Sequence, residues 1–278
     1  MKKIAAITMV RNDDFYLRKW VEYYSRELGA GNLYIFFDGT DQEIPSFCEG
    51  THTEKLPKIG TDVVSNDKGR VQVMSRKAAE LFARGYQLVI GTDADEYIAV
   101  DPGLGVSLAA WLSEQPVKGT LSPLGLDLGQ KLGEETAIDP EKPFLSQRHY
   151  AVLGTRYTKA SILAAPLEWG SGFHRVKSHN FHIAKDLYLF HAGYFDMDRI
   201  QARFADASRL EQGWERHLRK RSRTVRQVSG LPARAFDTWT RIARVLQAVF
   251  RPPYAWNKPG MLGLKIVVRI PDRFQTVI

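Results

Sequence analysis

The sequence has a single cysteine and no long run of apolar residues. One cysteine, Cys48, excludes an internal disulfide framework and suits a reducing compartment. No stretch is long and apolar enough to predict a membrane span. The apolar start of the chain stops at Val10, and the polar stretch 11–14 follows without a small-residue cleavage pattern, so we interpret it as a first strand and not as a signal peptide. These absences predict a cytoplasmic protein.

Glycine-rich phosphate-binding loops and repeats are also missing from the sequence. Gly103-Leu-Gly105 lacks the third glycine of a dinucleotide loop and does not directly follow a predicted strand, which excludes a Rossmann fingerprint. We find no internal repeat and no low-complexity tract. No recognised nucleic-acid-binding module accompanies the basic residues of the chain, so we expect no nucleic-acid partner.

The composition is that of a soluble globular protein, with an uneven distribution of charge. Of the 278 residues, 44% are hydrophobic and 25% are charged, which allows a sizeable core. The 39 Lys and Arg exceed the 31 Asp and Glu by eight, but segment 216–251 alone has ten Lys or Arg and one acid, Asp237. That segment carries +9, so the basic character belongs to a C-terminal module and not to the whole fold.

The first hundred residues alternate between strand and helix patterns. Residues 4–10 form an uninterrupted apolar run, as a buried parallel strand does, and the following apolar stripe predicts a helix that ends at Gly29. The expected strands cover 4–10, 32–37, 63–64 and 87–92, and the expected helices cover 14–28 and 71–82. This order predicts an α/β fold with a mostly parallel central sheet flanked by helices.

The second half of the chain is less regular. We expect a short helix over 107–114, an irregular region from Thr120 to about Ala165 with strands near 157–163, and a last strand over 187–190. From Asp196 onward the apolar spacing is helical. We therefore predict a catalytic domain over 1–195, with halves of about 1–100 and 101–195, and a basic helical extension over 196–278.

Polar residues follow three of the predicted strands directly. Arg11 and Asn12 follow the first, Asp38 follows the second, and Asp93 and Asp95 follow the strand that ends near Thr92. Ligands of mostly parallel sheets lie beyond the carboxyl ends of the strands. We expect these residues to share one edge of the sheet.

The stretch GTDADEYIAV, residues 91–100, is either a metal-and-phosphate site or a solvated acidic turn. Two aspartates separated by a small residue provide hard oxygen ligands of the kind that Mg²⁺ and Mn²⁺ prefer. A divalent cation held there neutralises the charge of a departing diphosphate. Short acidic strings are common, and the position at the end of a strand favours the metal interpretation. Glu96 is expected to give structural support.

Three segments in this order resemble the GT-A nucleotide-sugar glycosyltransferases, particularly family-2-like bacterial members: MVRNDDFYLRKWVEYY (9–24), YIFFDGTD (34–41) and VIGTDADEYI (89–98). The match covers about the first hundred residues, and Asp13 stands where the family usually has Glu. The resemblance implies a GT-A-like fold and a nucleotide-diphosphate sugar donor. It also implies that Arg11 and Asn12 line the nucleotide pocket and that Asp38 holds the base or ribose.

The resemblance further implies that Asp93 contacts the ribose or sugar and that Asp95 ligates Mn²⁺ or Mg²⁺. Enzymes of this kind often use a histidine after a late strand as another ligand, and His191 follows Leu-Tyr-Leu-Phe. A histidine bonded to backbone at a strand end is the alternative. Lys159 is a candidate contact for a phosphate, although a solvated lysine is the ordinary interpretation.

The catalytic base is expected in the segment Glu168-Trp-Gly-Ser-Gly-Phe-His174. Inverting transfer needs a carboxylate or imidazole that takes the proton of the acceptor hydroxyl. The segment resembles the acceptor loops of family-2-like enzymes but lacks their usual Glu-Asp pair, which leaves the base and the inverting outcome open. Glu168 and His174 are the two candidates, and Asp127 is a third, less favoured one.

The basic C-terminal helices have two interpretations. Arg234, Arg241, Arg244 and Arg251 lie largely opposite an apolar stripe, as in an interfacial helix on anionic lipid. That arrangement predicts a peripheral position on the inner face of the plasma membrane, through 216–251. The alternative is an amphipathic helix packed on the catalytic domain with solvated arginines.

Together these patterns predict a metal-dependent glycosyltransferase that moves a sugar, from a UDP-sugar in particular, to a hydroxyl of a cell-envelope glycan or lipid-linked acceptor. One alternative is a metal-dependent nucleotidyltransferase, an enzyme that would need a glycine-rich phosphate-binding loop after the first strand. Residues 11–14, Arg-Asn-Asp-Asp, are not such a loop. The other is a non-enzymatic basic protein associated with membrane or nucleic acid. Loss of Asp93 or Asp95 would have favoured it, and both are present.

Overall fold

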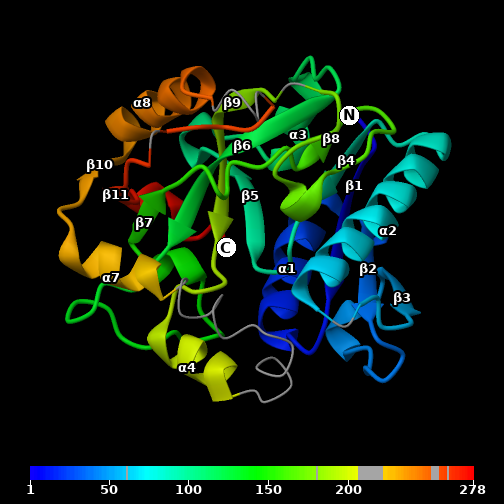
Figure 1. The fold of residues 1–278 in the computed structure, drawn as a ribbon, viewed down its shortest axis with the longest axis horizontal. Helices are drawn as coiled ribbons and strands as arrows, with labels where there is room; N and C mark the ends of the chain where they lie inside the picture. Colours follow the sequence, from blue (N-terminus) through cyan, green and yellow to red (C-terminus); the bar gives the residue numbers. More distant parts are fainter. Residues whose placement is uncertain (61, 180, 206–221, 252–256, 262) are drawn as a thin grey trace.

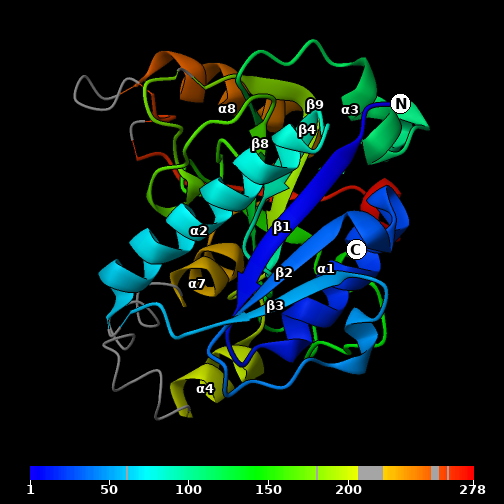
Figure 2. The same ribbon diagram turned by 90° about the vertical axis from the view of Figure 1, so that its right-hand side faces the viewer.

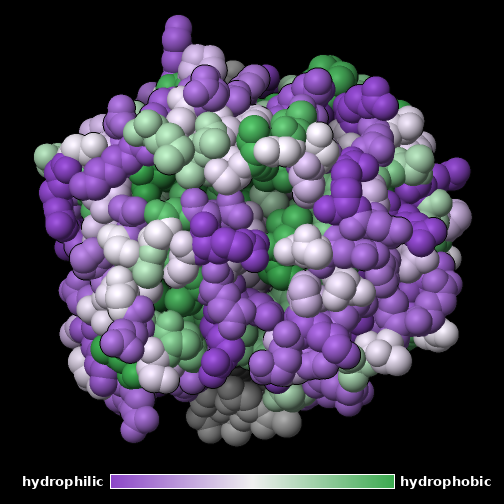
Figure 3. Space-filling view, turned by 180° about the vertical axis from the view of Figure 1, so that it is seen from behind, coloured by the Kyte–Doolittle hydropathy of each residue, from purple (hydrophilic) through white to green (hydrophobic). Residues whose placement is uncertain are grey.

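The computed structural model describes residues 1–60, 62–179, 181–205, 222–251, 257–261 and 263–278. In these parts of the chain eleven strands form one sheet, in the order β10-β11-β7-β6-β8-β4-β1-β2-β3, with β9 pairing with both β6 and β5. Figure 1 shows the sheet running through the molecule with helices on its outside. From behind, the surface is mostly hydrophilic, with hydrophobic residues showing between polar ones in the upper and central parts (Figure 3).

The N-terminal part contains the parallel strands of the sheet. β2 pairs with β1 and β3, and β1 pairs with β4, all in parallel. The strands are β1 (Ile4–Val10), β2 (Leu33–Asp38), β3 (His52–Leu56) and β4 (Leu88–Gly91), and the helices between them are α1 (Asp14–Leu28) and α2 (Val63–Ala83). The first two strands and the first helix confirm the sequence prediction to within one residue, and Gly29 ends the helix as expected.

Alternate residues of these strands face opposite helices. Ile4 and Ala6 of β1 belong to the core cluster that contains the α1 residue Trp20, whereas Ala5 and Ile7 belong to the cluster of α2. Successive side chains of a strand point to opposite faces, so an uninterrupted apolar run buries both faces at once. In Figure 2 the helices α1 and α2 lie on either side of β1 to β3.

The second half of the sheet is mixed, so the prediction of a mostly parallel sheet is wrong. β8 runs antiparallel to β4 and β6, β7 runs antiparallel to β6 and β11, and β9 is parallel to β6 but antiparallel to β5. The strands are β5 (Glu96–Val100), β6 (Thr120–Leu128), β7 (Tyr150–Leu153), β8 (Ile162–Leu163) and β9 (Ile183–His191), and α3 (Leu108–Glu114) follows β5.

Two further expectations about secondary structure are wrong. The region from Thr120 to about Ala165 is only partly irregular: it contains β6 and β7 besides β8, which lies within the expected strand region 157–163. β6 tolerates Pro123 where its register with β9 shifts between Ser122 and Leu124. Residues 63–64 are not a strand. They begin α2, since the Asp62 side chain accepts hydrogen bonds from the Val64 and Ser65 amides and caps the helix.

The C-terminal part adds strands as well as helices. Its elements are α4 (Met197–Ala205), α7 (Arg223–Gly230), β10 (Arg234–Ala235), α8 (Phe236–Val249) and β11 (Ile266–Arg269). β11 pairs with β7, and Phe274 lies in the main core, so the extension over 196–278 is not only helical. The basic residues Arg216, Arg219, Lys220 and Arg221 lie outside the described residues. So do residues 206–215, where the apolar spacing from Asp196 onward predicts helix.

Candidate active site

Three acidic residues converge where β4 ends and β5 begins. We call Asp93, Asp95 and Glu96 the acidic cluster. Each offers a carboxylate oxygen within 4.8 Å of the others, the arrangement of a possible metal site. Asp93 and Asp95 are partly exposed, whereas Glu96 is fully buried. The Asp93 amide donates to Glu96 Oε2 at 3.3 Å, and the Glu96 amide donates to the Asp93 carbonyl at 3.1 Å, so the turn is held in a defined shape.

Two cations contact this cluster from other elements. Lys159 Nζ lies 3.0 Å from Asp93 Oδ2 and 2.5 Å from Glu96 Oε1. Arg70 of α2 pairs with the other oxygen of Asp93 and, at 2.9 Å, with Asp67. Asp93 is therefore held between a lysine and an arginine.

The ordinary interpretation of Lys159 as a solvated residue is wrong. Its side chain is 4% exposed, and its burial lowers the pKa of Lys159 against the opposing effect of the Glu96 carboxylate. Both Lys159 and Arg70 lie over the ring of Phe173, at 5.7 and 5.2 Å from its centroid. The aromatic face and the carboxylates together compensate the cost of burying the ammonium group.

His191 joins the acidic cluster through the topology of the sheet. β9 lies between β5 and β6, and its last residue is in register with Glu96 on one side and Asp127 on the other. His191 Nδ1 lies 2.7 Å from Asp127 Oδ1, and Nε2 lies 3.7 Å from Asp95 Oδ2. The imidazole is 2% exposed and stacks on Tyr157 with ring centroids 3.8 Å apart. Thr224 Oγ1 of α7 donates to the second oxygen of Asp127 at 2.5 Å.

Asp95 and His191, with Asp127 bonded to the imidazole, fit a divalent cation. The second ring nitrogen of a metal-bound histidine is usually hydrogen-bonded to a carboxylate. Nδ1 of His191 is bonded to Asp127 in this way, which leaves Nε2 directed toward Asp95. Carboxylate oxygens and one imidazole form a donor set for Mn²⁺ or Mg²⁺. Gly193 allows the close approach, because a Cβ there would lie 2.2 Å from Asp95 Oδ2 and 2.7 Å from His191 Nε2.

The predicted nucleotide residues lie at the ends of the neighbouring strands β1 and β2. Arg11 Nη1 donates to the Asp38 carbonyl at 2.6 Å, and its guanidinium forms a two-point ion pair with Asp41. The hydrogen bond to Asp41 raises the pKa of Arg11. Asp38 Oδ1 accepts from the Ile59 amide at 2.8 Å. The Asn12 amide donates to Gln42, and Asn12 adopts a positive φ of 47°. The parallel pairing of β4, β1 and β2 puts these residues and the acidic cluster on one edge.

The two candidate bases occupy different surroundings. Glu168 is 65% exposed and forms an ion pair with Lys177 at 2.5 Å, across the hairpin closed by Trp169 and Val176. His174 is partly buried, and its burial lowers the pKa of His174 to about 3, with Lys159 acting in the same direction. Its imidazole is therefore neutral at neutral pH and a weak base.

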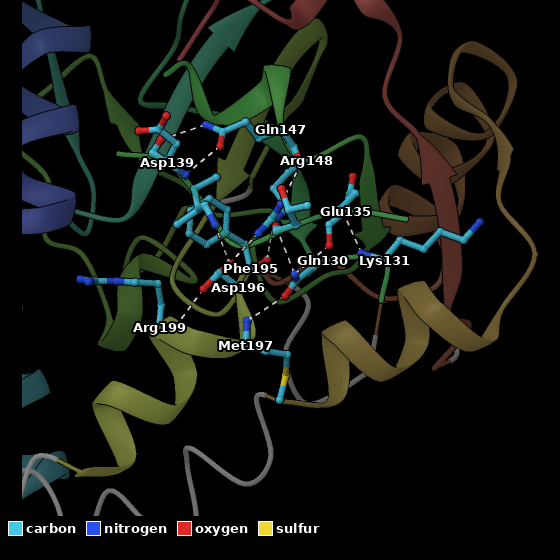
Figure 4. Close-up of polar contacts among 12 residues, drawn as sticks. Gln130, Lys131, Glu135, Asp139, Gln147, Arg148, Phe195, Asp196, Met197 and Arg199 are labelled. Carbon is cyan, nitrogen blue, oxygen red and sulfur yellow. Dashed lines mark hydrogen bonds and ion pairs between the residues drawn. The ribbon is translucent and has the colours of Figure 1, made fainter. Parts of the chain in front are cut away.

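A buried network supports the segment that follows His191. Arg148 donates to Asp196 Oδ2 at 2.6 Å and to the Phe195 carbonyl at 2.9 Å, and the side chains of this ion pair are each 1% exposed. Figure 4 shows the pair among its neighbours Gln130, Glu135 and Gln147. Because Asp196 lies five residues after His191, its ion pair with Arg148 ties the end of β9 to the interior of the fold.

Sequence reasoning missed Arg70 and placed Asp127 in another role. Asp127 is the one acid in the nine-residue strand β6, TLSPLGLDL, and a lone acid in an apolar strand is the signal that could have revealed it. Arg70 is one of many polar residues on α2, and no spacing distinguishes it. Its importance comes from contacts between segments 23 residues apart in the sequence.

No family model and no curated protein sequence matches the chain. Among solved structures, the mannose-1-phosphate geranyltransferase from Thermus thermophilus is 12% identical over 98% of this chain and 76% of its own, with a TM-score of 0.30. The mannosyltransferase Ktr4p from S. cerevisiae is 10% identical over 46% of this chain and 40% of its own, with a TM-score of 0.29. At these TM-scores the likeness says nothing about the activity of the present chain.

Proposed function

We propose that the protein is a metal-dependent glycosyltransferase that moves a sugar from a UDP-sugar to a hydroxyl of a cell-envelope glycan or lipid-linked acceptor. The observation that carries this proposal is the meeting of the acidic cluster with His191 on one side and with Arg70 and Lys159 on the other. Carboxylates beside an imidazole suit a divalent metal ion. The adjacent side chains of Arg70 and Lys159 suit the phosphate groups that such an ion accompanies.

Each part of the site has a role in the proposed reaction. Asp95 and His191 would hold Mn²⁺ or Mg²⁺, which neutralises charge on the departing diphosphate when bound. Arg70 and Lys159 supply N–H donors to the phosphate oxygens. Asp93, fixed between these two cations, contacts the ribose or sugar of the donor.

The proposal assigns other residues to the nucleoside and to the acceptor. In the proposal, Arg11 and Asn12 line the nucleotide pocket, and Asp38 holds the base or ribose. Either Glu168 or His174 takes the proton of the acceptor hydroxyl, whose oxygen bonds to the anomeric carbon of the sugar as the bond from that carbon to the diphosphate breaks. The attack comes from the face opposite the departing diphosphate, so the transfer inverts the configuration. A base with a pKa of about 3, as His174 has, is poorly matched to neutral pH. A loss of turnover in Glu168→Gln with little change in His174→Ala would assign the base to Glu168.

Binding of UDP is the first test of the proposal. We expect calorimetric titration to detect UDP binding that requires Mn²⁺ or Mg²⁺, because the acidic cluster repels a bare diphosphate. Hydrolysis of a panel of nucleotide sugars then identifies the donor. Metal-independent UDP binding, or no binding of any nucleoside diphosphate, would contradict the proposal. Release of inorganic diphosphate from a nucleoside triphosphate and a sugar 1-phosphate would favour a nucleotidyltransferase instead.

Gly193→Ala tests how closely Asp95 and His191 approach. The added methyl group would displace both side chains, since its Cβ would overlap Asp95 Oδ2 and His191 Nε2. We expect metal-dependent UDP binding to weaken by about 10- to 100-fold while the fold is kept. Gly154→Ala is the matched control, because a Cβ at Gly154 meets nothing within 4 Å. Equal affinities of the two variants would show that Gly193 does not shape the site.

A further inference from the structure

The helix α8 presents apolar side chains to the outside of the molecule. Its buried residues are Phe236, Thr240, Ala243 and Gln247. On the opposite side Ile242, Val245 and Val249 are 38%, 58% and 67% exposed, and Phe250, directly after the helix, is 42% exposed. Single exposed apolar residues are normal, but Ile242, Val245 and Val249 recur at steps of three and four and form one stripe, which Phe250 follows directly. We call these four residues the α8 stripe.

Positive charge borders the α8 stripe. Arg241 is exposed and Arg244 partly exposed on the same helix, on the side of the stripe next to Val245. Asp237, the one acid of α8, is paired with Arg273 at 2.5 Å and is thus already neutralised. The outer side of the helix therefore combines apolar side chains with guanidinium groups that have no acidic partner on the same helix.

We propose that the α8 stripe docks on an anionic lipid surface, with its apolar side chains in the acyl boundary and Arg241 and Arg244 at the headgroups. An interfacial helix needs an apolar face bordered by Lys or Arg, which is what α8 presents. The long arginine side chains reach phosphate groups while their methylene groups stay beside the stripe. This surface does not depend on the proposed glycosyl transfer.

Lipid fits the α8 stripe better than other partners do. A stable protein interface buries about 1,200–2,000 Å² in total, much more than four side chains of one helix provide. Nucleic-acid binding uses the positive groups but gives no role to exposed valines and isoleucine. No helix in the described part of the chain is long and apolar enough to cross a membrane. Shallow contact through α8 needs no such helix.

The position of α8 connects this surface to the site. Phe236 packs on Tyr188 of β9, with ring centroids 5.1 Å apart, and β9 ends at His191. Figure 1 shows α8 on the outside of the molecule, on the opposite side from α2. A membrane-bound α8 would hold the end of β9 at a fixed distance from the lipid surface.

Flotation of the full chain with vesicles tests the proposal. We expect the wild type to float with vesicles of phosphatidylcholine and phosphatidylglycerol and to be released by high salt, and to bind vesicles of phosphatidylcholine alone much less. Val245→Glu/Val249→Glu should lower the vesicle-bound fraction by at least about tenfold. Arg241→Gln/Arg244→Gln should lower affinity for anionic vesicles by about 30-fold and remove the preference for them.

Val106→Glu is the matched control, because Val106 is 44% exposed and lies outside α8. It should float as the wild type does, and circular dichroism should show that every variant is folded. Absence of flotation of the wild type with anionic vesicles would overturn the proposal, as would unchanged flotation of Val245→Glu/Val249→Glu. A dimer in solution that Val245→Glu/Val249→Glu abolishes would also overturn it, in favour of a second copy of the chain.

Discussion

Asp95→Ala is expected to abolish the metal dependence of UDP binding. Asp95 Oδ2 is the carboxylate oxygen that lies 3.7 Å from His191 Nε2, and the second nitrogen of this imidazole is already held by Asp127. Removing this carboxylate leaves His191 as the remaining proposed ligand, because the other two acids of the cluster, Asp93 and Glu96, are paired with Lys159. Since even an outer partner of a metal ligand changes metal affinity by about 10- to 100-fold, we expect a loss of at least about 100-fold for Asp95 itself.

The measurement is calorimetric titration of UDP with and without Mn²⁺, for the wild type and three variants. Asp93→Asn is the control within the acidic cluster. Because Asp93 is bound by Lys159 and Arg70, its amide should weaken UDP binding but leave the requirement for metal. Asp139→Ala, which removes a partly exposed acid paired with Lys142, should change nothing. If Asp95→Ala still binds UDP more tightly with Mn²⁺, the assignment of Asp95 as a ligand is wrong.

The shared edge of the sheet was predictable from the sequence for a physical reason. The runs at β1, β2 and β4 are short, apolar and separated by helix patterns, which makes parallel pairing the expected result. Parallel neighbours put their carboxyl ends together, so Arg11, Asp38 and Asp93 had to come to one edge. No knowledge of the contacts between distant segments was needed.

The remainder of the site depends on pairings that local pattern does not contain. Asp127 reaches His191 because β9 inserts between β5 and β6, and a proline in β6 conceals that strand from propensity arguments. Lys159 is buried because Phe173 and two carboxylates surround it, although lysine is ordinarily exposed. Both outcomes come from tertiary contacts that overcome the preferences of single residues.

Arg148→Met is expected to destabilise the fold by about 3–5 kcal/mol. Asp196 also accepts hydrogen bonds from the Ile138 and Arg199 amides, at 3.0 and 2.9 Å, so its carboxylate would stay buried without its cation. Removing one member of a buried ion pair costs more than the pair contributes, because the remaining charge keeps its desolvation penalty. Denaturant unfolding followed by circular dichroism measures the loss.

The exposed pair of Arg84 and Glu80 supplies the control for this experiment. Their side chains are 54% and 49% exposed, so Arg84→Met should cost less than about 1 kcal/mol. The double variant Arg148→Met/Asp196→Leu should recover much of the loss, since neither charge is then left buried alone. A cost for Arg148→Met as small as that for Arg84→Met would mean that the pair does not support the segment after His191. A double variant as unstable as the single one would assign the loss to packing and to the lost acceptor of the Ile138 and Arg199 amides, and not to the unpaired carboxylate.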